Sequence, residues 1–312
     1  MSFAAEVRNE LARIIPDKEC CRKAELHAIF ITSGQEFTMP NEEYLLLVKV
    51  ENAATARKVF QLLKQTYHVQ ATVEIDNKKR FKKTRRYSIS ALLDAEQKKE
   101  LADFKMPLNA KNIINRTWVS KNCCRKAFLR GIFLSRGFIS KPESNYHLEI
   151  VLNNDELASE LVKLFSKFNL HARIVQRKQQ LVIYIKESEQ IVDFLRIAGA
   201  SKALLHFENI RILKSMRNTV NRQVNCETAN LAKTIEAAVR QIELVEKLSV
   251  NEELGSLTAP LNEIAQLRIS YPDATLKELG EMLTPPLSKS GVAYHMRRLE
   301  KRAREIIGHG RK

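Results

Sequence analysis

Residues 20–34 read CCRKAELHAIFITSG, and residues 123–137 read CCRKAFLRGIFLSRG. Nine of the fifteen positions are identical in the two segments, which lie 103 residues apart. Two related segments in one chain predict an internally duplicated domain, with each copy at the same place in its own half. Each segment has the pattern of a helix that ends at a glycine, Gly34 or Gly137, so we expect the same helix to open both halves.

The same order of elements follows each copy. The first half has β-rich runs and helical periodicity, which predict strands at 44–50, 69–75 and 86–90 and helices at 54–67 and 96–104. The second half predicts strands at 146–152, 171–176 and 181–186 and helices at 155–168 and 189–198. We therefore expect an α+β fold in which an αββαββα unit occurs twice. Its repeats span 1–110 and 111–205, and together they form one pseudo-symmetric domain.

The rest of the chain is predicted to be all-α. Residues 206–259 form a helical linker, with residues 207–248 helical throughout, and residues 260–312 form a helix-turn-helix domain. Thr275 and Glu278 form a capping box at the start of one helix. The pair Pro285 and Pro286 ends it, because proline lacks an N–H donor and restricts the residue before it. Ser288 then caps the last helix.

The last helix has one apolar face and one cationic face. The apolar stripe is Val292, Met296, Leu299, Ala303 and Ile306. Early residues of a recognition helix reach base edges and later ones meet phosphates. The base-reading candidates are Ser288, Lys289, Ser290, Tyr294 and Arg297. The phosphate candidates, within a DNA-binding region at about 275–308, are Thr275, Lys277, Arg298, Lys301, Arg302 and Arg304. A small helical domain that docks on another protein is the alternative.

The order of elements and the two helices that end in glycine resemble the LAGLIDADG homing-endonuclease fold. The corresponding motifs are LHAIFITSG at 26–34 and LRGIFLSRG at 129–137, with Ala28 and Gly131 where the two helices pack closely. In that family the residue before each final glycine is a carboxylate that holds a divalent metal. Ser33 and Arg136 occupy those degenerate positions here. Metal-assisted hydrolysis requires hard oxygen ligands, so we expect neither a metal site nor nuclease activity.

A basic hairpin is predicted between the last two strands of the first half. Residues 78–86 read KKRFKKTRR, with seven basic residues in nine. A two-stranded ribbon can enter the major groove, and such clusters bind phosphate. A solvated hairpin tip is the alternative interpretation. The residues of this possible second DNA contact are Lys78, Lys79, Arg80, Lys82, Lys83, Arg85 and Arg86.

Charge and cysteine content limit the kinds of partner. The chain carries 52 Lys and Arg against 36 Asp and Glu, a net charge of +16 that indicates a polyanionic partner such as nucleic acid. No apolar run approaches the roughly 20 residues that cross a bilayer, so we expect a cytoplasmic protein associated with the nucleoid. The five cysteines lack the spacing of zinc ribbons, and adjacent cysteines on a helix point in different directions. We expect them to be packed at helix starts, without a metal or cofactor.

The whole chain is similar to the WhiA family, which combines a degenerate LAGLIDADG domain, a helical linker and a C-terminal helix-turn-helix. The stretches RNTVNRQVNCETANLAKT and LKELGEMLTPPLSKSGVAYHMRRL carry this resemblance. It implies a sequence-specific regulator that binds double-stranded DNA in bacterial cell division, chromosome segregation or sporulation. Such a protein regulates transcription and does not cleave DNA. A second regulatory protein could dock on the duplicated domain. A metal-dependent endonuclease and a cell-division scaffold with incidental DNA binding stay open as alternatives.

Overall fold

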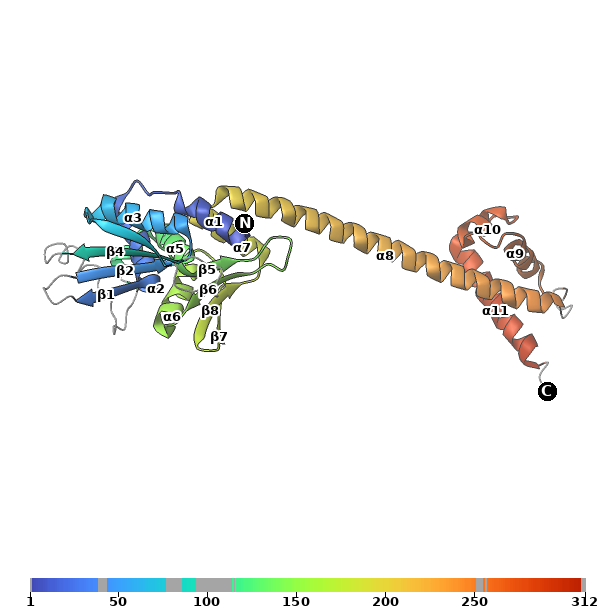
Figure 1. The fold of residues 1–312 in the computed structure, drawn as a ribbon. Helices are drawn as coiled ribbons and strands as arrows, with labels where there is room; N and C mark the ends of the chain where they lie inside the picture. The colour runs from blue at the N-terminus through green and yellow to red at the C-terminus, as the bar shows by residue number, and fades with distance from the viewer. Residues whose placement is uncertain are drawn as a thin grey trace. The chain divides into compact units, whose positions relative to one another are not determined.

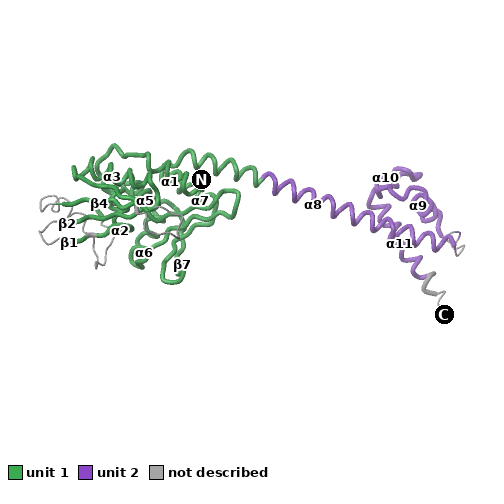
Figure 2. The backbone as a smooth tube through the Cα atoms, viewed as in Figure 1, with its two compact units in different colours: residues 1–215 green, residues 216–312 purple. Residues whose placement is uncertain are grey.

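The computed structural model describes residues 2–38, 44–76, 86–93, 114, 116–250, 255 and 257–309. The chain divides into two compact units, residues 1–215 and residues 216–312 (Figure 2). Among the described residues, no helix is both long enough and apolar enough to cross a membrane.

The first repeat forms a four-stranded antiparallel sheet in the order β1-β2-β4-β3. Helix α3 packs on this sheet and shares a core with it (Figure 1). The predicted helix at 96–104 lies outside the described residues. After the N-terminal helix α1 (Phe3–Ala12), the elements are α2 (Glu19–Ser33), β1 (Gly34–Thr38), β2 (Tyr44–Val50), α3 (Ala53–Tyr67), β3 (Ala71–Asp76) and β4 (Arg86–Leu93).

The second repeat forms a matching antiparallel sheet in the order β5-β6-β8-β7. Its complete αββαββα order confirms the predicted unit. The elements, after the short 3-10 helix η2 (Arg116–Val119), are α5 (Asn122–Arg136), β5 (Gly137–Ile139), β6 (Leu148–Leu152), α6 (Asp155–Ser166), β7 (Arg173–Arg177), β8 (Gln180–Ile185) and α7 (Ser188–Ala198).

Helices α2 and α5, which contain the two sequence copies, pack directly on each other at the centre of this unit. A Cβ added at Gly131 would lie 2.4 Å from the Glu25 carbonyl oxygen and 2.8 Å from the Ala28 Cβ. Such distances are too short for any larger side chain, so glycine is required where the helices cross. The predicted close contact at Ala28 and Gly131 is confirmed.

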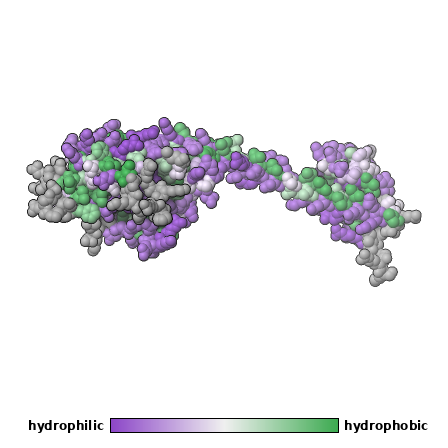
Figure 3. All heavy atoms as spheres, viewed as in Figure 1, coloured by the Kyte–Doolittle hydropathy of each residue, from purple (hydrophilic) through white to green (hydrophobic). Residues whose placement is uncertain are grey.

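A single long helix, α8 (Ser201–Val250), begins in the first unit and ends in the second. Phe207 near its start is buried in the core of the second repeat, and Val245 and Leu248 near its end are buried in the C-terminal core. Between these ends, exposed apolar side chains recur along the helix, and hydrophobic patches along it are visible in Figure 3. They include Ile212, Met216, Val220, Val224, Leu231 and Ile235.

The C-terminal unit is a small helical domain. Helices α9 (Ala259–Ser270), α10 (Leu276–Met282) and α11 (Lys289–His309) enclose one core with the end of α8. A Cβ added at Gly280 would lie 2.2 Å from the Leu287 carbonyl oxygen and 3.0 Å from Val292. The turn therefore passes directly over this glycine, which explains why α10 contains a residue that costs about 1 kcal/mol in a helix.

Candidate nucleic-acid interface

Helix α11 has the two faces that its sequence predicts. Val292, Met296, Leu299 and Ala303 are buried in the core of the C-terminal unit, while the side chain of Ile306 lies outside the described residues. A helix turns once in 3.6 residues, so a residue about two positions before or after a buried one lies on the opposite face. The exposed residues on that opposite face are Ser290, Tyr294, Arg297, Lys301 and Arg304.

The start of α11 is fixed by Ser288. Its Oγ accepts a hydrogen bond from the Gly291 N–H at 3.2 Å and lies 3.0 Å from the Ser290 Oγ, and its carbonyl accepts the Val292 N–H. The predicted cap is confirmed. Because this hydroxyl caps the helix, Ser288 is better placed to orient α11 than to contact a base. Lys289 is exposed at the first helical position, on the flank of the cationic face.

The middle of α11 presents an aromatic residue beside arginines. Tyr294 is 57% exposed, and the Arg298 guanidinium lies 5.8 Å from the centre of its ring. This cation–π contact extends both side chains along the helix surface. Arg297 is exposed and adjacent in sequence. A large planar ring and a free guanidinium therefore occupy the part of the helix from which side chains reach base edges.

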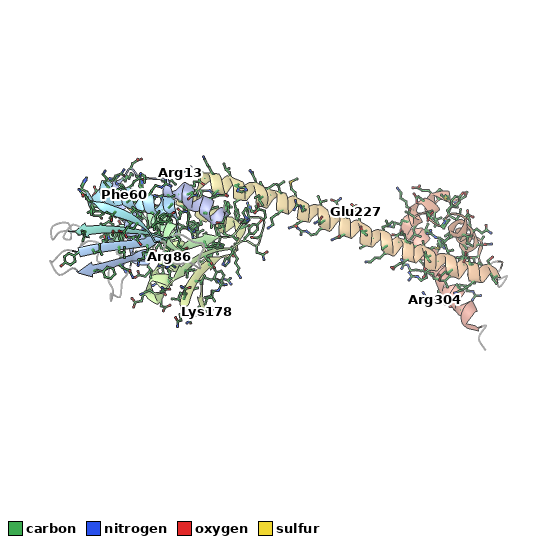
Figure 4. All side chains as sticks on the ribbon, in the orientation of Figure 1. Arg13, Phe60, Arg86, Lys178, Glu227 and Arg304 are labelled. Atoms are coloured by element: carbon green, nitrogen blue, oxygen red, sulfur yellow. The ribbon has the colours of Figure 1, made fainter. Side chains whose placement is uncertain are left out.

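The remaining phosphate candidates are all exposed, and several have weak acidic neighbours. Arg302 pairs with Glu305 at 3.5 Å, Arg304 with Glu300 at 3.9 Å and Lys277 with Glu281 at 3.7 Å. Exposed pairs of this kind contribute roughly 0–1 kcal/mol, so a phosphate can replace the carboxylate easily. Arg304 is labelled on α11 in Figure 4.

Thr275 caps the preceding helix α10. Its hydroxyl accepts the Glu278 N–H at 3.3 Å, while the Glu278 carboxylate accepts the Thr275 N–H at 2.7 Å. The predicted capping box is confirmed. Thr275 and Lys277 are exposed at the start of α10, where backbone N–H groups favour an anion.

Of the predicted second DNA contact, only Arg86 lies among the described residues. Lys78, Lys79, Arg80, Lys82, Lys83 and Arg85 lie outside the described residues. Arg86, the last of the run, begins β4 and lies 3.8 Å from the Glu51 carboxylate (Figure 4 labels its position).

The two degenerate metal positions lie at the C-terminal ends of the central helices α2 and α5. Ser33 and Arg136 are the last residues of α2 and α5. The Arg136 Nε donates a hydrogen bond to the Thr32 carbonyl at 2.8 Å, and the Thr32 and Ser135 hydroxyls lie 2.7 Å apart. Hydroxyl contacts and a guanidinium thus connect the helix ends, and neither Ser33 nor Arg136 supplies a carboxylate there.

A cavity of about 380 Å³ opens beside these helix ends. It is lined by four cations, Arg8, Lys49, Arg86 and Arg136, and, among the described residues, by one carboxylate, Glu51. Burial lowers the pKa of the Arg8 and Arg136 guanidinium groups, and the nearby Glu51 opposes that shift. Arginine nevertheless keeps its charge in proteins. The cavity is therefore electropositive, which disfavours a divalent cation.

Sequence reasoning missed Arg8 and Lys49 as parts of this cavity. Arg8 comes from α1, outside the duplicated pattern, and its Nη2 donates to the Gly137 carbonyl. Lys49 is an exposed residue of β2, and nothing in the sequence around it indicates a binding role. Only the packing of α1 and of both repeats around the helix ends brings these side chains together.

Glu25 is an acidic residue of the central helix pair, and two cations neutralise its charge. Its side chain is fully buried between Lys58, whose Nζ lies 2.5 Å from Oε1, and Arg130, which contacts both carboxylate oxygens at 3.0 and 2.8 Å. Lys58 also donates to the Leu11 carbonyl, and Arg130 to the Ala198 carbonyl. This buried triad joins both repeats and has no free oxygen directed at the electropositive cavity.

The four cysteines of the duplicated segments correct a prediction. The adjacent pairs were expected to point apart, yet the Sγ atoms of Cys20, Cys21, Cys123 and Cys124 all lie within 4.8 Å of one another. Spacing within one pair could not reveal this, because the cluster is assembled by the packing of α2 on α5. The expected burial at the helix starts is confirmed, since Cys21 and Cys124 are buried and their neighbours are half-buried.

The basic residues at the start of α8 hold that helix to the first unit. Arg211 pairs with Glu208 at 2.8 Å and Glu189 at 3.5 Å. The Lys214 Nζ donates to the carbonyls of residues 142–144 and lies 4.4 Å from the Tyr146 ring centre. These side chains are engaged with protein, so we assign them no phosphate contact.

Comparison with known proteins identifies each part of the chain. Residues 19–103 match the family model of the WhiA N-terminal LAGLIDADG-like domain, and residues 125–217 match that of the WhiA LAGLIDADG-like domain. Residues 220–303 match the model of the WhiA C-terminal HTH domain.

Curated relatives match over nearly the whole length. The "Probable cell division protein WhiA" of Syntrophomonas wolfei subsp. wolfei is 53% identical over 312 residues, which cover 98% of this chain and 99% of the relative. A protein of the same name from Heliobacterium modesticaldum is 44% identical, with 99% and 98% covered. The crystal structure of full-length WhiA from Thermatoga maritima has a TM-score of 0.61 at 25% identity, with 98% and 99% covered. The chain therefore belongs to the WhiA family.

Proposed function

We propose that this chain is a sequence-specific DNA-binding protein that acts in bacterial cell division and does not cleave DNA. The observation that carries the proposal is the exposed face of α11, on which Ser290, Tyr294 and Arg297 lie opposite a buried apolar stripe. The helix-turn-helix family match and the names of the relatives support it.

In this proposal α11 enters the major groove with its capped N-terminus first. Arg297 is long enough to bond a guanine edge with two N–H groups, and Lys289 can reach O6 or N7. Tyr294 supplies apolar contact and one hydroxyl. Arg298, Lys301, Arg302 and Arg304 neutralise phosphates farther along, with Thr275 and Lys277 on α10 fixing the register. Ser288 contributes by orienting the helix.

The proposed absence of cleavage rests on the ends of α2 and α5. Metal-assisted hydrolysis uses carboxylates that hold a divalent ion and lower the pKa of its bound water. Ser33 and Arg136 supply no carboxylate, and four cations line the adjacent cavity. Glu25 is neutralised by two buried cations, and the side chain of Glu36 on β1 lies outside the described residues.

The role within the cell extends the proposal further. We infer a transcription regulator of division genes that acts in the cytoplasm on the nucleoid and influences chromosome segregation and sporulation through the genes it controls. The duplicated domain would add affinity through its basic hairpin or bind a second regulatory protein. A division scaffold with incidental DNA binding predicts instead that all DNA affinity disappears with rising salt.

Binding measurements with the full chain test the DNA-reading helix. The probe is a genomic fragment recovered by crosslinking, measured by fluorescence anisotropy at fixed salt. We expect Lys289→Ala and Arg297→Ala each to weaken binding by about 1–3 kcal/mol if they contact bases. Arg57→Ala, an exposed arginine on α3, is the matched control and should change the affinity little. Equal affinity for all four proteins would refute the assignment of α11.

A plasmid assay tests the absence of cleavage separately. Supercoiled DNA incubated with the full chain and Mg²⁺ or Mn²⁺ should stay intact while a mobility shift shows that it is bound. Cleavage that Glu36→Gln abolishes, or that Glu25→Gln abolishes in a chain whose circular dichroism shows that it is folded, would show that the duplicated domain is an active nuclease.

A further inference from the structure

The four-cysteine cluster lies at the opposite end of the helix pair from the degenerate metal positions. Cys20 and Cys21 are the second and third residues of α2, and Cys123 and Cys124 are the second and third residues of α5. All four Sγ atoms lie within 4.8 Å of one another, and the Cys123 and Cys124 sulfurs are 4.0 Å apart. Each repeat thus contributes two ligands to one compact group.

We propose that these four cysteines form a closed site for a single zinc ion. In a tetrahedral site, zinc–sulfur bonds of about 2.3 Å place the sulfurs about 3.8 Å apart. The sulfurs here therefore need to approach by only about 1 Å or less. Four thiolates are soft ligands, which select zinc over magnesium or calcium. A cluster of several irons is larger than one ion and would require the two helices to separate.

The backbone around the cluster favours thiolates. Neither helix has a side-chain cap, because the N-cap residues are Lys18 and Lys121 and neither makes a capping hydrogen bond. The Cys21 N–H already donates to the Lys18 carbonyl at 3.0 Å, so the N–H groups of the preceding residues in each first turn are the ones that can donate to the sulfurs. The positive ends of the two helix dipoles add to this effect, since anionic groups are stabilised there.

Two equivalent arginines make the site rigid. Arg22 donates to the carbonyls of Pro16 and Asp17, at 3.1 and 2.7 Å. Arg125 donates to those of Val119 and Ser120, at 2.7 and 2.8 Å. Each arginine directly follows a cysteine pair and ties the approaching chain to its helix. A Zn(Cys)₄ centre carries a net charge of −2, and these two guanidinium groups offer matching positive charge.

Zinc at this site would act as a cross-link between the repeats. Each thiol releases one proton as it binds, so loading frees four protons per ion and requires no oxidant. The metal connects α2 to α5 at the end where Ala24 and Ala127 keep the helices close. A ligand that binds only the folded state stabilises that state. The first unit should therefore unfold at a higher temperature when zinc is bound.

Metal analysis of the full chain tests this proposal. The protein is purified reduced without chelators, and its zinc is quantified by mass spectrometry. We expect one zinc per chain, and after removal, one Co²⁺ per chain with the intense sulfur-to-metal absorption of a tetrathiolate. Cys21→Ser combined with Cys124→Ser should abolish both signals. Cys226→Ser, which changes an exposed cysteine on α8, should leave both unchanged.

Folding and oxidation are controlled in the same samples. Fluorescence of Trp118, the single tryptophan, shows whether the cysteine variant keeps its folded first unit. If that variant fails to fold, Co²⁺ titration of the wild-type chain decides alone. Five free thiols in a folded wild-type chain that binds no Co²⁺ would overturn the proposal. So would a disulfide within the cluster of freshly purified reduced protein, or metal binding that survives in the double variant.

Discussion

Replacing Glu25 with glutamine tests the buried triad that joins the two repeats. The substitution preserves size but removes the negative charge between the Lys58 Nζ, at 2.5 Å, and the Arg130 guanidinium, at 2.8 Å. Both cations would then share a buried site without their carboxylate partner, because the side chains of Glu25 and Lys58 are fully buried. Breaking a buried pair in this way costs about 3–5 kcal/mol of unfolding free energy. That is a large share of the roughly 5–15 kcal/mol of a typical domain.

The pH dependence of the variant sharpens this prediction. Burial lowers the pKa of Lys58 to about 8 from 10.5, with Glu25 opposing that shift. The unfolded chain therefore binds the extra proton between these values, so stability rises with pH through this window by up to about 3 kcal/mol. Without Glu25 the folded pKa of Lys58 falls further. The difference in unfolding free energy between the wild type and Glu25→Gln should consequently become smaller from pH 7 to pH 9.

Urea unfolding followed by Trp118 fluorescence measures both effects, because Trp118 belongs to the first unit and stacks on His27 of α2 at a ring-centre distance of 5.6 Å. Glu189→Gln is the matched control, because Glu189 is 84% exposed and pairs with Arg211 at 3.5 Å. It should cost less than about 1 kcal/mol. Adding Lys58→Met to Glu25→Gln should restore part of the loss. A loss below about 1 kcal/mol for Glu25→Gln at pH 7 would show that the Glu25 charge does not hold the two repeats together.

Two further predictions concern an acid-sensitive histidine and a glycine in the turn. Burial lowers the pKa of His27 to about 4 from 6.5. As the pH falls from 6.5 to 4, the unfolded chain therefore binds a proton that the folded chain does not. The unfolding free energy of the first unit should decrease by up to about 3 kcal/mol over this range. His27→Phe should flatten this slope in urea unfolding at pH 4.5 to 7, and an unchanged slope would assign the acid sensitivity elsewhere. Gly280→Val should destabilise the C-terminal unit by about 1–3 kcal/mol and weaken DNA binding, because its Cβ would lie 2.2 Å from the Leu287 carbonyl oxygen. Gly255→Val is the control in thermal unfolding by circular dichroism, because among the described residues no atom lies within 4 Å of a Cβ added there. Equal melting curves for both variants would contradict the packing argument.

Most of the architecture could be predicted from local patterns. The duplicated segment predicts α2 and α5, and periodicity predicts α3, β2, α6 and α7 to within a few residues. The short strands β1 and β5 begin at Gly34 and Gly137, directly where each helix ends. No apolar alternation marks them in the sequence, because each is an edge strand held by its neighbour.

A candidate site could be predicted from the sequence only where its residues lie close together along the chain. The caps at Thr275 and Ser288 and the cationic face of α11 depend on residues a few positions apart, so the sequence contains them. The cysteine cluster and the Glu25 triad join residues about 100 positions apart. Their chemistry arises only when α2 packs on α5, and no spacing rule for a single segment describes it.

In the proposed function, this chain selects its DNA sites with helix α11. Genome-wide crosslinking of the wild-type chain and of the Tyr294→Ala, Arg297→Ala double variant, expressed at equal levels, tests it most directly. Both residues are exposed, so the variant should fold normally. We predict discrete occupied sites with a shared motif for the wild type and their loss in the variant. The same sites, occupied equally by both proteins, would contradict the account.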